Sequence, residues 1–168
     1  MKFRQIGSTG FKCSVIGLER LRQAGRIRFL GISSNSVPVL ETASRLPGIS
    51  CIETAINPMC TEVRSSVLPK IAAAQVGVIG NQVFSSGQLL TQNRRTEFLQ
   101  IRQQLAALSE LSWLSAQHLL IQFALAHPGV TCVLTGTTQV AHLGRNSADA
   151  LAGPLAAETR NSPLWVAT

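Results

Sequence analysis

From residue 25 onward, short apolar segments alternate with longer amphipathic ones, and this alternation restricts the fold more than any other feature. The pattern predicts strands over residues 28–32, 49–55, 77–80 and 130–134. It predicts helices over residues 37–45, 62–74, 96–108, 116–126 and 140–152. Strands that alternate with helices of about ten residues indicate βαβ units and a parallel sheet. Each predicted strand ends in glycine or small polar residues, and ligands bind at the carboxyl ends of strands in such folds.

The residues before this alternation predict a hairpin and a first strand. Residues 2–6 and 11–13 flank a turn with two glycines, which can supply the positive φ that a tight turn needs. Residues 14–18 are a short apolar segment that we expect to be a strand. Residues 19–24 then predict one or two helical turns that end at a glycine C-cap, Gly25.

The composition is typical of a globular protein, and we expect one domain over residues 1–168. The sequence is 45% apolar and 14% charged, which gives enough apolar surface to offset the entropy of ordering. Its formal net charge is +7, but the basic residues are scattered and have no aromatic residues between them to stack bases. We therefore interpret them as a solvated surface and expect no nucleic-acid partner. The most apolar stretch, 111–126, is too short and too polar for a membrane span, so we expect no membrane partner.

The cysteines and histidines predict neither disulfides nor a metal site. The four cysteines lack C-x-x-C pairing, and no histidine is spaced to join them. We therefore expect free thiols and a cytoplasmic protein. His118 is expected on the surface, and His127 is expected to end a helix before Pro128. Trp113 and Trp165 are expected to pack against other side chains.

Five segments, in the correct order and spacing, resemble the aldo-keto reductase family. Residues 1–18 are similar to that family's N-terminal hairpin and first barrel strand. Residues 25–33, which read Gly-Arg-Ile-Arg-Phe-Leu-Gly-Ile-Ser, resemble its fifth strand. Asn57-Pro58 matches the end of the sixth strand, and residues 77–90 match the seventh strand and its loop. Residues 126–146 match the eighth strand and its phosphate loop.

The resemblance implies an α/β fold, an incomplete TIM-type (β/α) barrel with an N-terminal β-hairpin and about five of the eight parallel strands. Residues 25–152 would supply strands five to eight, whereas a full barrel takes about 250 residues. The family implies NADPH-dependent carbonyl reduction by an Asp, Tyr, Lys and His tetrad on or after strands two to four. That region is missing at the Glu19–Arg20 junction, and the sequence has no Tyr. We therefore expect no catalytic residues and weak or no reductase activity.

At the nicotinamide end of the cofactor, the resemblance implies contacts from Ser33, Ser34 and Asn35 to the carboxamide. Glu53 falls where the family has a glutamine, and Asn81 falls where it has an aromatic ring that stacks on the nicotinamide. The same two serines and Asn35 also fit a role in capping the helix that follows. Both roles remain open from the sequence.

At the other end, the resemblance implies cofactor contacts from the loop after the seventh strand, at Phe84, Ser85, Gly87 and Leu89. For the adenosine half of NADP(H) it implies contacts from Gly136, Thr137, Thr138, His142 and Asn146. The amides at the start of this last helix lie at the positive end of its dipole, which favours a 2′-phosphate. Arg145 replaces a usual acid and adds favourable charge. An ordinary capped helix with an exposed histidine is the alternative.

Four functional hypotheses follow from these residues. In the first, the chain retains weak binding of a nicotinamide dinucleotide, NADP(H), with little or no reductase activity. In the second, it is a non-enzymatic homo-oligomer that pairs through exposed strand edges. In the third, it is a working reductase that takes its proton from water or a hydroxyl, and so lacks the rate contribution of about 100- to 10,000-fold that a placed proton donor makes. In the fourth, it is a truncated gene product without a selected role.

Overall fold

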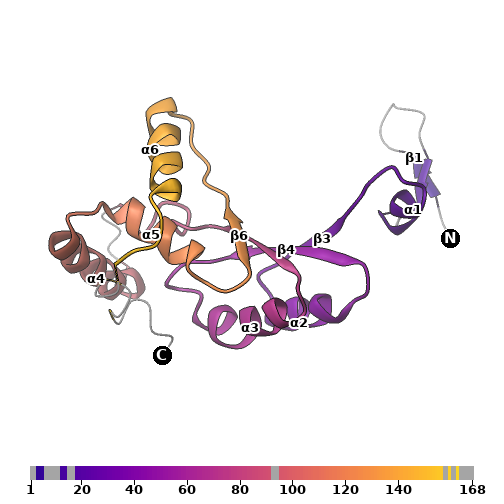
Figure 1. The fold of residues 1–168 in the computed structure, drawn as a ribbon, viewed down its shortest axis with the longest axis horizontal. Coiled ribbons are helices and arrows are strands. Elements are labelled where there is room, and N and C mark those ends of the chain that lie inside the picture. Colours follow the sequence, from indigo (N-terminus) through magenta and orange to yellow (C-terminus); the bar gives the residue numbers. More distant parts are fainter. Residues whose placement is uncertain are drawn as a thin grey trace.

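Four parallel strands form the central sheet of the protein (Figure 1). The structure is a computed structural model that describes residues 3–5, 12–14, 18–91, 95–156, 159 and 162. The strands follow the order β3 (Leu30–Ser33), β4 (Ile49–Ala55), β5 (Gly77–Asn81) and β6 (Val130–Val133). Neighbours in sequence are therefore neighbours in the sheet, and a helical crossover joins each pair, as parallel pairing requires. The predicted parallel α/β fold is confirmed.

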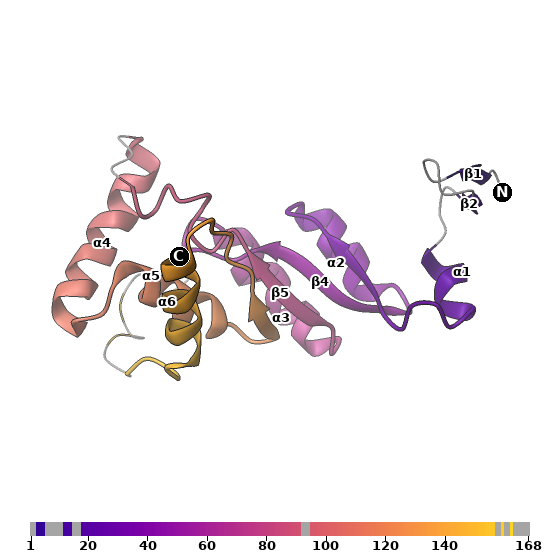
Figure 2. The same cartoon turned by 90° about the horizontal axis from the view of Figure 1, so that it is seen from above.

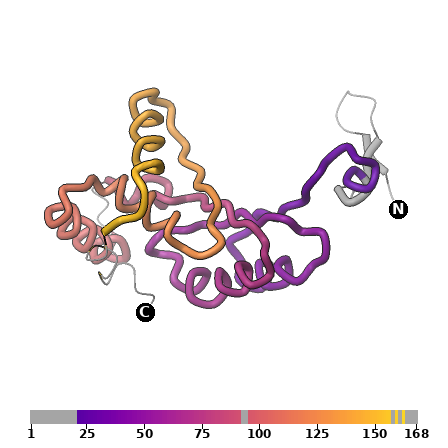
Figure 3. The backbone as a smooth tube through the Cα atoms, viewed as in Figure 1, coloured from indigo at the N-terminus to yellow at the C-terminus, as the bar shows by residue number. Residues whose placement is uncertain are grey.

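Helices cover one face of this sheet. Below the strands in Figure 1 lie α2 (Val37–Arg45) and α3 (Leu68–Ala73), and α5 (Ala116–Leu125) packs against β6. The remaining two helices, α4 (Thr96–Ser112) and α6 (Val140–Leu151), both pack on α5. Figure 2 shows α4, α5 and α6 together at one end of the molecule. Figure 3 shows how the chain leaves β6, rises and folds back as α6 toward α5.

The core lies between the sheet and the helices because strand side chains alternate between the two faces. Ile52 of β4 and Val78 of β5 are completely buried on the helix side. Leu40 of α2, Ile71 of α3 and Phe123 of α5 are also completely buried and belong to the same cluster. Burying an apolar side chain of this size contributes about 1.5–3 kcal/mol. The amphipathic pattern of the sequence thus fixes which face of each element is covered.

Two sequence motifs have structural explanations in this sheet. A Cβ atom on Gly31 would lie 2.5 Å from Cys51 Sγ on the adjacent strand, so a larger residue at that position of β3 would require the Cys51 side chain or the strands to move. Asn57, after β4, is 2% exposed and joins two strand ends. Its Nδ2 donates to the Gln82 carbonyl at 2.9 Å, and its Oδ1 accepts from the Met59 N–H at 2.9 Å.

Pro69 distorts the helix that was predicted over residues 62–74. A π-helical turn, η1 (Val63–Val67), comes first, and α3 then begins with Pro69 in its first turn. Proline has no N–H to donate to the preceding turn, which explains the irregular hydrogen bonding before it. This turn buries Arg64, whose guanidinium lies 4.9 Å from the Phe123 ring centroid and donates to the Pro58 carbonyl. Burial lowers the pKa of Arg64.

The N-terminal part contains the expected hairpin, whereas most of the expected first barrel strand lies outside the described residues. β1 (Phe3–Gln5) pairs antiparallel with β2 (Lys12–Ser14), and their connecting turn lies outside the described residues. Of the strand expected over residues 14–18, Ser14 already belongs to the hairpin and Leu18 begins the helix α1 (Leu18–Gln23), while residues 15–17 lie outside the described part. The expected five parallel strands are therefore four in the part of the chain that the structure describes. The glycine C-cap is confirmed, since Gly25 has φ +69°.

The end of α4 lies four residues beyond its predicted end. The apolar stripe is confirmed, with Phe98, Leu105 and Leu108 buried, but the helix continues to Ser112. It stops at Trp113, which adopts the left-handed φ of 59° and is 93% exposed. The expectation that Trp113 packs against other side chains was therefore wrong, and Trp165 lies outside the described residues.

Candidate functional site

A groove of about 350 Å³ opens at the carboxyl ends of β5 and β6. Six of its lining residues were predicted as cofactor contacts: Phe84, Gly87, Gly136, Thr137, His142 and Asn146. Six others line it as well: Leu90, Thr91, Ser115, Gln117, Arg145 and Asp149. Another cavity of about 350 Å³, beside the carboxyl end of α5, has no titratable side chain in its lining. The first groove is therefore the better candidate for a charged ligand.

One face of α6 supplies the polar wall of the groove. His142, Arg145, Asn146 and Asp149 stand at positions i, i+3, i+4 and i+7, so they share one side of the helix. Asn146 is only 9% exposed, whereas Arg145 is exposed. Asp149 was not predicted, although its helical spacing from His142 and Asn146 carries the signal. The groove therefore contains two basic groups and one carboxylate.

The position of α6 is fixed by polar contacts with α5. The His118 ring lies with Nδ1 3.0 Å from Asp149 Oδ1, and Gln122 Nε2 donates to the Asp149 backbone carbonyl at 2.6 Å. The prediction of His118 as a surface residue was wrong, because its side chain is 11% exposed. Pairing with a residue 31 positions away buries it, and sequence periodicity cannot show that contact.

The residues before α5 and before α6 both contribute to the lining of the groove. Ser115 is the predicted N-cap of α5, which is confirmed, since its hydroxyl accepts the His118 N–H at 3.1 Å. Thr137 precedes α6, and its hydroxyl accepts the Gln139 N–H at 3.1 Å. Thr138 is exposed and does not line the groove. The positive ends of helix dipoles favour an anion at such a place.

The loop after β5 has an uncommon backbone. Ser85, Ser86 and Gly87 have φ values of 48°, 55° and 82°, all in the left-handed region. Two consecutive non-glycine residues with positive φ store strain, which is typical of ligand-binding loops. Gly87 lines the groove and Ser85 does not. Leu89, predicted as a cofactor contact, buries its side chain in the core at 3% exposure, so only its backbone is left for such a contact.

The residues predicted for the nicotinamide end gather at the carboxyl ends of β3, β4 and β5. Ser33 and Glu53 are register partners, and the Ser34 N–H donates to the Glu53 carbonyl at 3.0 Å. Glu53 Oε1 accepts from Asn81 Nδ2 at 2.7 Å. Asn81 Oδ1 is buried and has no hydrogen-bond partner. This cluster therefore holds an unused acceptor.

Two of these residues also have structural roles. Asn35 Oδ1 accepts from the Ala55 N–H at 2.9 Å and so ties the loop after β3 to the end of β4. Ser34 Oγ accepts from the Ser36 N–H at 3.1 Å, which shapes the entry to α2. The helix N-cap itself is Ser36, which makes no side-chain capping bond. The capping role considered for residues 33–35 is thus a loop contact rather than a helix cap.

Among the described residues, no cluster of three or more His, Cys, Asp or Glu could hold a metal ion. Cys51, Cys60 and Cys132 are free thiols. Burial raises the pKa of the Cys60 thiol, which disfavours the reactive thiolate. In the part of the chain that is described, no helix is long and apolar enough to cross a membrane.

The model of the aldo/keto reductase family matches residues 14–160. The chain belongs to the aldo/keto reductase family. The groove and the nicotinamide-end cluster thus lie at the carboxyl ends of strands that correspond to part of that family's barrel. A search of curated proteins found no match.

Solved aldo-keto reductases share this fold. The apo form of aldo-keto reductase AKR11C1 from Bacillus halodurans is 28% identical with a TM-score of 0.66, over 84% of this chain and 52% of that one. An aldo/keto reductase from Klebsiella pneumoniae, solved in complex with NADP and acetate, is 17% identical with a TM-score of 0.67, over 84% of this chain and 48% of its own. The chain therefore spans about half the length of the solved structures it matches.

Proposed function

We propose that this chain binds NADP(H) along the carboxyl ends of its strands and does not reduce carbonyls by itself. The groove carries the proposal: it brings His142, Arg145 and Asn146 of α6 together with Gly136 and Thr137. Two basic side chains near the start of α6 suit a phosphate. A 2′-phosphate distinguishes NADP(H) from NAD(H), so we propose a preference for NADP(H).

The nicotinamide-end cluster fits the other half of the cofactor. Asn81 Oδ1 is a buried acceptor without a partner, and a carboxamide N–H would satisfy it. Ser33 lies next to Glu53 in the same cluster. When bound, NADPH supplies a hydride, and the role of these residues is to orient the carboxamide. Asn81 cannot stack on the nicotinamide ring, which supports weak binding at this end.

The absence of tyrosine from the sequence supports the second part of the proposal. Carbonyl reduction needs a positioned acid for the forming alkoxide, and the sequence contains no tyrosine. His118 is engaged with Asp149, and the ring of His127 is held by the Phe123 carbonyl at 2.8 Å from Nδ1. Neither histidine belongs to the nicotinamide-end cluster. The free thiols of Cys51, Cys60 and Cys132 support a cytoplasmic location, which cell fractionation would check.

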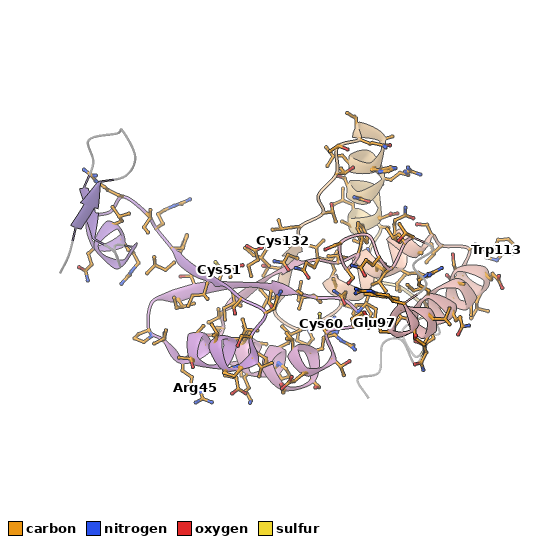
Figure 4. The ribbon with its side chains drawn as sticks, turned by 180° about the vertical axis from the view of Figure 1, so that it is seen from behind. Arg45, Cys51, Cys60, Glu97, Trp113 and Cys132 are labelled. Carbon is orange, nitrogen blue, oxygen red and sulfur yellow. The ribbon has the colours of Figure 1, made fainter. Side chains whose placement is uncertain are left out.

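A titration of NADPH, followed by its fluorescence, tests the binding. Arg145→Glu should weaken NADPH binding at least tenfold, because a hydrogen bond to a charged group contributes about 1.5–3 kcal/mol and a tenfold change is about 1.4 kcal/mol. NADH, without a 2′-phosphate, should respond less. Arg45→Glu is the matched control, since Arg45 is exposed on α2, away from the groove (Figure 4).

Two outcomes would reject the proposal. If millimolar NADPH produces no fluorescence change with the wild-type chain, the groove does not bind this cofactor. If the purified chain consumes NADPH rapidly with a panel of aldehydes, a proton donor is present and the chain is a working reductase. Equal losses of affinity in the two charge-reversal variants would show a general effect of net charge rather than a contact in the groove.

A further inference from the structure

Among the described residues, no strand pairs with either outer edge of the sheet. β3 and β6 are the outermost strands, and each has one neighbour among the described residues. Backbone groups alternate in direction along a strand. Because the Ser34 N–H donates to β4, the N–H and carbonyl groups of Ser33 face the outer edge of β3. Because the Leu134 N–H donates to the Gly80 carbonyl of β5 at 2.8 Å, those of Val133 face the outer edge of β6.

The sheet also has an open face, opposite the helices. Register partners place Ser33, Glu53, Ile79 and Cys132 in one row across all four strands. Ser33 and Cys132, at the two ends of this row, are exposed, and Ile79 is half-buried. In Figure 4, where Arg45 marks the helix side, the opposite side of β4 carries no described helix, and α1 contacts β3. This is the face that a closed barrel turns inward.

We propose that two copies of this chain close one eight-stranded barrel, with β6 of each copy paired to β3 of the other. TIM-type barrels close with eight parallel strands, and the described residues supply four. A two-fold axis along the barrel keeps every strand parallel and makes the two junctions identical. The solved aldo-keto reductases are about twice as long as the matched part of this chain, so two copies supply one barrel.

A second copy fits better than any single added strand. One strand from another protein would pair with one edge and leave the other edge and the open face exposed. A second copy pairs both edges of both sheets and covers both open faces in the same step. The inference concerns strands and edges, and it does not rest on the binding of NADP(H).

The mass in solution, from size exclusion with light scattering, tests this closure. The expected particle has twice the 18.0 kDa mass of the chain. Cys132→Lys should weaken the dimer at least tenfold, because the exposed thiol position becomes an interior one and a buried unpaired charge is costly. Leu111→Lys adds the same charge at a position of α4 that is 71% exposed, and it should leave the dimer intact.

A second measurement compares the rate at which a maleimide labels Cys132 at high and at low protein concentration. Peptide mass spectrometry identifies the labelled cysteine. Cys132 should be protected at high protein concentration and react rapidly on dilution, while circular dichroism shows that the Cys132→Lys variant is folded. A folded monomer at high micromolar concentration, larger open assemblies, or a dimer that Cys132→Lys does not weaken would each overturn the proposal. NADPH titration of the same samples tests cofactor binding in the groove separately, so failure of the dimer proposal can be told apart from failure of the binding proposal.

Discussion

Asn35 offers the sharpest test of whether a predicted cofactor contact serves the fold. Its Oδ1 accepts the Ala55 N–H at 2.9 Å and is 3.4 Å from Thr54 Oγ1. Ala55 is 3% exposed, so water cannot easily replace that acceptor. Asn35→Ala leaves a buried N–H without a partner, at a cost of about 1–3 kcal/mol. For a chain of this size, each kcal/mol lowers the melting temperature by about 2–4 °C.

Urea unfolding followed by circular dichroism measures this loss, and NADPH titration of the same variant measures the cofactor contact. Asn35→Ala should be less stable by the stated amount while its NADPH affinity changes less than twofold. Asn35→Asp keeps the acceptor and serves as the control, with most of the stability retained. An Asn35→Ala variant as stable as the wild type but with much weaker NADPH binding would refute the structural role and support the carboxamide contact.

Two other predictions concern packing and pH. Gly31→Ala should lower the free energy of unfolding by about 1–3 kcal/mol, because its Cβ would lie 2.5 Å from Cys51 Sγ. In urea unfolding, the double variant with Cys51→Ala should recover part of this loss. A Gly31→Ala variant as stable as the wild type would contradict the reasoning. Burial lowers the pKa of His127, with a smaller opposite effect of its bond to the Phe123 carbonyl. The unfolded chain therefore binds more protons near pH 6, so stability should fall as the pH drops below about 6.5. His127→Gln should flatten that slope, and an equal slope in both proteins would exclude His127 as its source.

The order and type of the elements followed from the sequence because they depend on local patterns. The helix over residues 37–45 and the strand over 49–55 match the structure at both ends. Periodicity states which side of an element is apolar, and that side must be buried whatever the partner. Glycine at position 25 and serine at 115 also acted as predicted, since caps depend on residues a few positions away.

Part of the candidate site could be predicted from local sequence patterns in the same way. The spacing of His142 and Asn146 on one helix places them together whatever the fold, and resemblance to a family supplied Gly136 and Thr137, which also line the groove. Asp149 shares that helical face, so its spacing carried a signal, but its contact with His118 of another helix has no signal in a local pattern.

Only the tertiary structure decided the remaining features. The burial of His118, the tie from Asn35 to Ala55 and the closeness of Gly31 to Cys51 all join residues about 20 or more positions apart. The sequence by itself determined a parallel βα architecture and a polar helix face, since both arise from spacing within one element. Packing between elements decides which strands form the edges of the sheet and which side chains meet across it. The free energy of such packing depends on residues far apart in the sequence, so no local pattern reveals it.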